Sequence, residues 1–314
     1  MFHSQETLNM LELNYQATQN LNPNQNFTWI AANNSLKKDS IETHIDDIHI
    51  IQGIRQDELK LRGNYHHSLG LNKLMPYVQT RFLLVIDSDF YIVRKNWIQE
   101  VLTHMPQNKL SCLGAPWHPK WPLKWRYIPA AQFCTFYDLD KVDINKLDFR
   151  PPFPKPTYKQ EKPEHQKKSD ILESILWITS PKRRFLIGKS KEIGYRILHD
   201  LLKKPEHKSE ALTPVFRPKE DFIEPYMGSA FNRILETFIP DKFSFIPKHK
   251  NYYTKKSFAD HGRYDARSYA FEEFMWKKNP FGFHIRGTKQ YHVEKEEKKE
   301  VINKALKSFA INLY

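Results

Sequence analysis

The chain has 314 residues, of which 40% are hydrophobic and 14% aromatic, so it is long enough to bury a sizeable core. Its formal charge of +13 favours anionic partners, such as nucleic acid, an anionic membrane surface or phosphorylated small molecules. Two cysteines, Cys112 and Cys134, exclude a disulfide framework and favour a reducing, cytoplasmic compartment. No apolar stretch reaches roughly 18 residues, so the sequence predicts no membrane-spanning helix.

The N-terminal part of the chain alternates between helical and strand patterns. Residues 5–20 have apolar side chains at helical spacing and are predicted to form a helix. Short strands are predicted at 28–32 and 48–51, and a helix at 66–78 leads into the apolar run 82–86. Such a run is typical of a strand buried on both faces of a parallel sheet. The alternation predicts an α/β fold with a mostly parallel central sheet flanked by helices.

The rest of the chain is less regular. An apolar patch at 90–93 is followed by a predicted helix at 96–104. Residues 148–190 contain a proline-rich, charged segment and are predicted to be a flexible, irregular insertion. The last elements expected are a helix at 271–276, a strand at 281–285 and an amphipathic helix at 294–310.

Two carboxylates, Asp87 and Asp89, come directly after the apolar run 82–86. In open α/β sheets ligands bind beyond the carboxyl ends of the strands, and residues at i and i+2 project the same way. Mg²⁺ and Mn²⁺ take oxygen ligands and often bridge to phosphates. The spacing therefore favours a metal–diphosphate site, and the alternative is an ordinary acidic turn.

The apolar run, Asp87-Ser88-Asp89, the patch at 90–93 and Lys95-Asn96-Trp97 together resemble the metal-binding motif of GT-A glycosyltransferases, particularly family-2-like ones. Residues 29–35 (WIAANNS) look like the second strand of that fold. Residues 66–73 (HHSLGLNK) are similar to the segment before the metal-motif strand, and 271–287 to a late acidic helix and a His-bearing strand. The resemblance covers most of 5–145 and about 220–290.

This resemblance implies a single GT-A-like, Rossmann-like catalytic domain over residues 1–314. Residues 1–145 would be the nucleotide-sugar-binding half, 148–190 the flexible insertion, and 191–314 the acceptor-binding and C-terminal half. The sequence departs from the family at its start. GT-A enzymes usually begin with a strand whose end contacts the nucleotide, and here only Met1-Phe2-His3 precede the first predicted helix.

The resemblance also implies roles for individual residues. Asp89, helped by Asp87 and His284, would bind Mn²⁺ or Mg²⁺, with His261 and His292 as competitors for the histidine position. Asn33, Asn34, Asp87 and Arg286 would contact the nucleotide sugar. Glu273 is the preferred catalytic base, with Glu272 beside it and Asp265 in reserve, because an inverting transfer needs a carboxylate to take the acceptor proton.

The function expected is metal-dependent transfer of a sugar from a nucleotide-diphosphate donor to a hydroxyl of a glycan or lipid-linked acceptor, with inversion. No nucleic-acid partner is expected, and the basic charge favours peripheral association at the inner membrane face. Three alternatives stay open. They are a haloacid-dehalogenase-type phosphatase, although Tyr91 stands where that pattern normally has Thr or Val, a basic nucleic-acid-binding protein, and a non-catalytic interaction protein.

Overall fold

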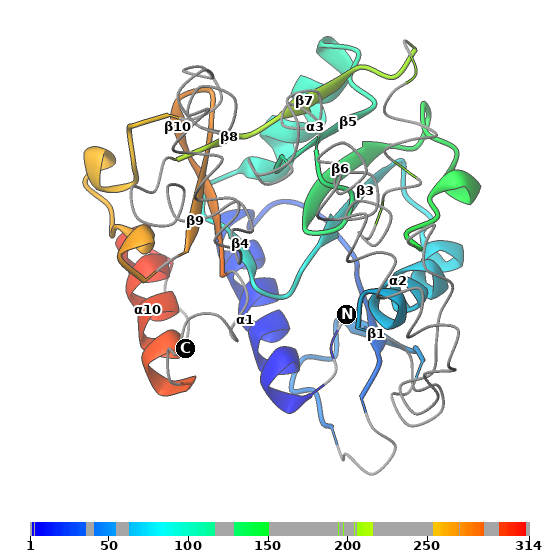
Figure 1. Ribbon diagram of the computed structural model, residues 1–314, viewed down its shortest axis with the longest axis horizontal. Coiled ribbons are helices and arrows are strands. Elements are labelled where there is room, and N and C mark those ends of the chain that lie inside the picture. The colour runs from blue at the N-terminus through cyan, green and yellow to red at the C-terminus, as the bar shows by residue number, and fades with distance from the viewer. Residues whose placement is uncertain are drawn as a thin grey trace, which may run out of the picture.

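The computed structural model describes residues 2, 4–35, 41–54, 63–116, 129–150, 194, 197, 204, 206–215, 254–269, 271–285 and 295–311. Within these residues the chain has mixed α/β structure, with one two-stranded and two four-stranded sheets accompanied by helices (Figure 1). The predicted α/β class is confirmed at this level. The predicted insertion at 148–190 lies almost entirely outside the described residues.

The N-terminal elements form the two-stranded sheet and its covering helix. Helix α1 (Gln5–Leu21) begins at Ser4, whose hydroxyl accepts the backbone N–H of Thr7 while Thr7 Oγ1 accepts the N–H of Ser4. Strands β1 (Trp29–Asn33) and β2 (Ile48–Gln52) pair in parallel. Phe2 makes a parallel bridge beside Asn33 on the other edge of β1. The predicted helix and both predicted strands are confirmed.

The second sheet contains the strand that ends at Asp87. Helix α2 (Gly63–Leu74) and a 3-10 turn (Met75–Tyr77) lead into β3 (Phe82–Ile86). The strand order is β3-β6-β5-β7, where β5 spans Cys112–Gly114, β6 Cys134–Asp138 and β7 Ser209–Ala211. Strand β6 is antiparallel to both β3 and β5, whereas β7 is parallel to β5.

The third sheet joins distant parts of the sequence. Its order is β4-β10-β9-β8, and all its pairs are antiparallel. Strand β4 spans Phe90–Ile92, β10 Asn279–His284, β9 Glu272–Trp276 and β8 Thr213–Pro214. Helix α3 (Trp97–Gln107) follows β4, and α10 (Lys295–Ser308) is the last helix among the described residues. Short 3-10 turns cover Ile144–Lys146, Ala259–His261 and Ala266–Tyr269.

Two details differ from the sequence-based expectation. Five of the seven described strand pairs are antiparallel, so the expected mostly parallel pairing is found only in β1–β2 and β5–β7. The predicted helix at 271–276 is wrong, because these residues form β9. A two-residue turn at Lys277 and Lys278, both with positive φ, folds β9 back onto β10.

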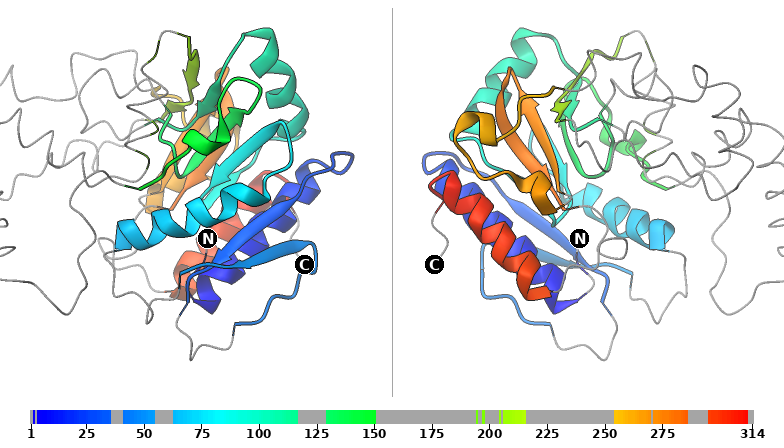
Figure 2. Two further views of the ribbon diagram at one scale, coloured as in Figure 1. Left: turned by 90° about the vertical axis from the view of Figure 1, so that its right-hand side faces the viewer. Right: turned by 60° about the vertical axis from the view of Figure 1, so that its left-hand side comes forward.

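Helices cover the strands from both sides. Helix α2 lies on one side, and α1 and α10 lie on the other (Figure 2). The alternation of side chains along β1 explains this arrangement, since Ala32 belongs to the core that includes Leu71 and Leu74 of α2, and Ala31 to the core that includes Leu8 and Leu11 of α1. Within the described helices, none is both long and apolar enough to cross a bilayer. Cys112 and Cys134 are buried free thiols.

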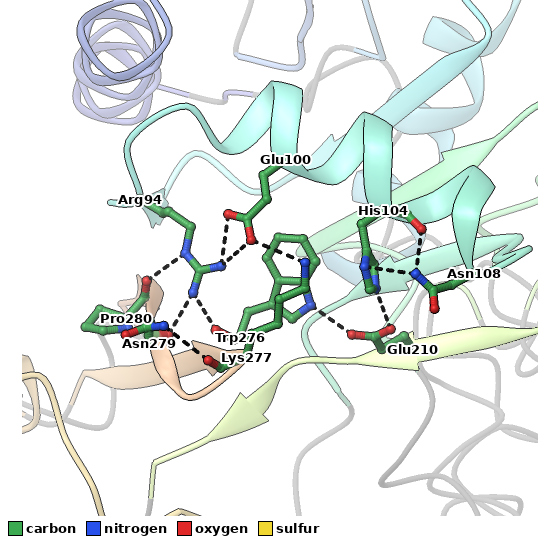
Figure 3. Close-up of polar contacts among 9 residues, drawn as sticks. All are labelled: Arg94, Glu100, His104, Asn108, Glu210, Trp276, Lys277, Asn279 and Pro280. Atoms are coloured by element: carbon green, nitrogen blue, oxygen red, sulfur yellow. Dashed lines mark hydrogen bonds and ion pairs between the residues drawn. The ribbon is translucent and has the colours of Figure 1, made fainter.

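The turn of the β9–β10 hairpin is fastened to α3 by a polar cluster (Figure 3). The guanidinium of Arg94 donates to the carbonyls of Trp276, Asn279 and Pro280 and pairs with Glu100 at 3.2 Å. The indole of Trp276 donates to Glu210 at 2.8 Å, and Glu210 also contacts His104 at 2.8 Å. These contacts hold the turn of the hairpin against α3. They thereby help to position Glu272 and His284, which lie at the other end of the hairpin.

Candidate metal centre

Asp87 and Asp89 lie in a tight turn between β3 and β4. The carbonyl of Asp87 accepts the N–H of Phe90 at 3.1 Å and closes the turn, while the N–H of Asp87 donates to the carbonyl of Phe133 at 3.2 Å. Both carboxylates are partly exposed. The turn therefore presents two carboxylates at the carboxyl end of β3, the edge where the sequence places them.

His284 reaches this turn through the third sheet. Strand β10 pairs with β4 so that His284 stands opposite Phe90, and the N–H of Ile285 donates to the backbone carbonyl of Asp89 at 3.0 Å. His284 Nε2 lies 3.5 Å from Asp89 Oδ1. Ligand atoms of Asp87, Asp89 and His284 all lie within 4.8 Å of one another. Backbone pairing thus unites residues almost 200 positions apart in the sequence.

Two neighbours hold the imidazole of His284. Its Nδ1 lies 3.0 Å from Glu272 Oε2, across the β9–β10 pair. Its ring stacks on Phe133 at 5.1 Å between centroids and 9° between planes. Because Nδ1 faces a carboxylate, we assign a proton to Nδ1. The other ring nitrogen, Nε2, faces Asp89. Nothing in the local sequence of Phe133 signals this stacking contact.

A second histidine, His67 of α2, also reaches the turn. Its Nε2 lies 3.5 Å from Asp87 Oδ1. The sequence points to its segment, 66–73, but assigns the residue no role. Asp87 is therefore approached by an imidazole from α2, and Asp89 by one from β10.

The electrostatics of the cluster suit a cation. Partial burial and the negative charge of Asp89 raise the pKa of Asp87 above its usual range, against a smaller opposing effect of His284. Burial lowers the pKa of His284, but the carboxylates of Asp89 and Glu272 outweigh it and raise that pKa. A bound cation would displace the Nε2 proton of His284, and two carboxylate oxygens and one imidazole nitrogen are then a donor set that Mn²⁺ accepts, whereas Mg²⁺ would use mainly the oxygens.

The two predicted nucleotide contacts, Asn33 and Asn34, lie at the carboxyl end of β1. The amide of Asn34 is buried, donates to the carbonyl of His66 at 3.1 Å and accepts the N–H of Ile54 at 3.0 Å. Asn33 Oδ1 accepts both the N–H and the hydroxyl of Ser35. Both side chains make bonds within the protein, and those of Asn34 join β1 to α2 beside His67.

The predicted base residues lie on opposite faces of β9. Glu272 faces His284, whereas Glu273 is fully buried and accepts the N–H groups of Phe258 at 2.9 Å and Ala266 at 2.8 Å. The structure therefore brings Glu272 to the cluster and not Glu273, because consecutive strand residues point to opposite faces. Burial raises the pKa of Glu273 to about 7.

The other sequence-based candidates are not part of the cluster. Arg286 and His292 lie outside the described residues, and the described His261 is not in the metal-binding group. Asp265 pairs with Arg267 at 2.8 Å. Comparison of the chain with models of protein families, with curated proteins and with solved structures gave no match. Functional conclusions therefore depend on the geometry of the site itself.

Proposed function

We propose that the protein is a metal-dependent glycosyltransferase that transfers a sugar from a nucleotide-diphosphate donor to a hydroxyl acceptor, such as a glycan or a lipid-linked acceptor. The observation that carries this proposal is the convergence of Asp87, Asp89 and His284, with ligand atoms within 4.8 Å of one another, at the carboxyl end of β3. Open α/β sheets bind phosphorylated ligands at this edge.

Each residue of the cluster has a distinct task in this proposal. Asp87 and Asp89 supply negative charge that retains a divalent cation, and His284 adds a nitrogen donor. Glu272 orients that donor through Nδ1. A bound divalent cation supplies the positive charge that offsets the developing charge on a diphosphate leaving group. Because Glu273 is enclosed by backbone donors, the proposal assigns it no catalytic role and applies to either stereochemical outcome.

The arrangement of the strands supports the GT-A form of the proposal. Strand β1 is parallel to β2 and to the bridge at Phe2, with α1 as the connection between Phe2 and β1. Strand β3 is followed by Asp-Ser-Asp, and the antiparallel β6 lies beside it. The resemblance implies a mostly parallel central sheet, and the parallel β1–β2 pair supports this whereas the antiparallel β3–β6 pair departs from it.

The phosphatase alternative uses the first Asp of an Asp-x-Asp pair as a nucleophile. Here a histidine from β10, His284, lies beside Asp87 and Asp89, with Nε2 3.5 Å from Asp89 Oδ1. An imidazole donor beside both carboxylates suits cation binding. Hydrolysis of a chromogenic phosphate ester measures this alternative. Turnover that is lost in Asp87→Asn would favour it over sugar transfer.

The test of the proposal is thermal unfolding of the full chain with nucleoside diphosphates, each with and without Mn²⁺. Ligands that bind the native state raise Tm. We expect one nucleoside diphosphate to raise Tm only when Mn²⁺ is present, and Asp89→Ala to abolish that rise. Asp46→Ala, at an exposed position between β1 and β2, is the matched control and keeps the rise.

An equal rise in the Asp89→Ala variant, or no rise with any nucleotide, would overturn the assignment of the site. Once a nucleotide is identified, the same protein is incubated with the corresponding nucleotide sugars. Release of the nucleoside diphosphate should then require both the cation and Asp89.

A further inference from the structure

Helix α2 carries a histidine that faces the candidate metal centre from outside its group of ligands. His67 Nε2 lies 3.5 Å from Asp87 Oδ1, and the two side chains are 23% and 24% exposed, so the contact lies where a cation from solvent can reach it. Within the described residues, the group whose ligand atoms all lie within 4.8 Å of one another contains Asp87, Asp89 and His284, and not His67. His67 is therefore a neighbour of one carboxylate.

The position of His67 is set by the packing of α2. Leu71 and Leu74 of this helix share one buried core with Ala32 of β1 and with Val85, which precedes Asp87 by two positions on β3. Moving α2 away from Asp87 would open this core, and opening a packed core is costly. The imidazole is thus held beside Asp87 by the rest of its helix.

The first turn of α2 is also bonded to the ends of the two parallel strands. Asn34, after β1, donates Nδ2 to the carbonyl of His66 at 3.1 Å, and its Oδ1 accepts the N–H of Ile54, after β2, at 3.0 Å. The ring Nε2 of His66 contacts the carbonyl of Ile54. Asn34 and His66 are buried, so these bonds are shielded from water. A displacement of His67 therefore reaches Asn34 and Ile54 through the adjacent His66.

The contact between His67 and Asp87 has the form of an outer contact in a metal site. Carboxylates that bind metal ions are themselves hydrogen-bonded, and loss of such a partner weakens metal binding. The separation of 3.5 Å is longer than the value of about 2.8 Å that is usual for a hydrogen bond to a carboxylate. A cation that fixes the carboxylate of Asp87 can shorten this contact, and the shorter contact would in turn order the start of α2.

We propose that His67 is a positioning residue that holds Asp87 and couples cation binding to the order of the first turn of α2, Asn34 and Ile54. In this role Nε2–H donates to Asp87 Oδ1, and the carboxylate binds the cation through its remaining lone pairs. The inference rests on the metal site of the proposed function but requires no nucleotide or sugar. Because Asn34 is at the carboxyl end of β1, the cation prepares the side of the site where the nucleotide is expected.

The first test is the affinity of the full chain for Mn²⁺, measured by isothermal titration. His67→Leu should bind Mn²⁺ about tenfold more weakly. His67→Gln should recover most of the affinity, since its amide N–H replaces Nε2–H, whereas His67→Asn has the same donor on a shorter side chain and should not. His49→Leu, at an exposed position of β2, is the matched control for the loss of an imidazole and should bind as the wild type does.

Hydrogen exchange tests the coupling separately from affinity. In the wild type, saturating Mn²⁺ should slow exchange of the Ile54 amide by about fivefold or more. The amide of Lys109, after α3, donates to the carbonyl of Pro106 and serves as the reference that stays unchanged. In Mn²⁺-saturated His67→Leu or His67→Asn the slowing at Ile54 should be absent. Agreement between these two variants excludes an effect of the leucine side chain itself.

Three outcomes would overturn the inference. Equal Mn²⁺ affinities in His67→Leu, His67→Asn and His49→Leu would remove the positioning role, and equal slowing at Ile54 in wild type and variants would remove the coupling. Pulsed EPR of bound Mn²⁺ counts the coordinating imidazoles, and we expect one, from His284, in every chain. A second imidazole that disappears in His67→Leu would make His67 a ligand instead. If the wild type itself fails to bind Mn²⁺, the proposed function fails first, so the two failures are distinguishable.

Discussion

His284 and Glu272 face each other across the β9–β10 hairpin, with Nδ1 of the imidazole 3.0 Å from the carboxylate oxygen. The same imidazole turns Nε2 towards Asp89 at 3.5 Å. A carboxylate behind a histidine fixes the ring and its tautomer, and this is the arrangement found around metal-ligating histidines. In the proposed function, Glu272 therefore acts through His284 and not by touching a substrate.

Removing this carboxylate should weaken metal binding without unfolding the protein. Glu272→Ala is expected to lower Mn²⁺ affinity by about 10- to 100-fold, because the imidazole loses the group that orients it. In Glu272→Gln the amide oxygen still accepts a hydrogen bond from Nδ1–H, so this variant should recover most of the affinity. Isothermal titration with Mn²⁺ measures both variants, and Glu300→Ala on the exposed face of α10 is the control. Equal affinities for the Ala variant and the control would contradict the positioning role.

Glu273 is expected to control stability and not activity. Its folded-state pKa of about 7 lies above the ordinary value of 4.5. The stability that this group contributes is therefore full below about pH 4.5 and lost as the pH rises through 7. The shift corresponds to about 3 kcal/mol.

Glu273→Gln should remove this pH dependence. The amide satisfies one of the two backbone donors, so the variant is expected to be about 2 kcal/mol less stable at pH 5. By pH 8 the difference in unfolding free energy between the variant and the wild type should narrow or close, since only the wild type then carries a destabilising buried charge. Urea unfolding at both pH values measures the gap, and a gap that widens with pH would show that Glu273 ionises without cost.

Gly53 is expected to be intolerant of a side chain because of Asn34. A Cβ atom on Gly53 would lie 1.9 Å from Asn34 Oδ1, which accepts the N–H of Ile54. Gly53→Ala should displace the buried amide and cost about 3 kcal/mol in unfolding free energy. Gly262→Ala is the contrast, since it meets no atom within 4 Å and has only its positive φ of 67° to oppose it, at about 1 kcal/mol. Similar losses of unfolding free energy in the two variants would show that the clash with Asn34 does not determine the effect of Gly53→Ala.

Much of the candidate site can be predicted from the sequence because the pattern that marks it lies within one short segment. An apolar strand followed by Asp87 and Asp89 specifies a position at a sheet edge, and His284 lies in a strand that is also recognisable from its apolar residues. Their meeting depends on the pairing of β4 with β10, which no short pattern encodes. For the same reason the contacts of Phe133 and His67 could not be foreseen.

The errors in the fold have a similar origin. Residues 271–276 have a helix-like composition, and the turn that makes them a strand is Lys277-Lys278 in place of the Asn-Gly that marks such hairpins. The sequence of strand β6, CTFYD, is short and mixed and does not signal a strand. Its burial comes from its position between β3 and β5. The family resemblance makes Glu273 a candidate base, and the sequence carries no signal for the two backbone N–H groups, of Phe258 and Ala266, that enclose its carboxylate.

A substitution at one of the two positions of the Lys277-Lys278 turn should stabilise the fold. Both residues have positive φ, 50° and 64°, which costs a residue with a Cβ atom about 1 kcal/mol. Lys277 has compensating contacts, since its ammonium lies 3.3 Å from Glu100 and 4.3 Å from the ring centroid of Trp276. Lys278 is exposed.

Lys278→Gly is therefore expected to stabilise the fold by about 0.5–1 kcal/mol, because glycine adopts this conformation without strain. Lys277→Gly is the matched contrast and should give no gain, since relief of strain is offset by loss of the ion pair and the cation–π contact. Urea unfolding of the two variants gives the difference. Equal gains would mean that the contacts of Lys277 contribute nothing, and a loss in Lys278→Gly would mean that the hairpin does not form this turn.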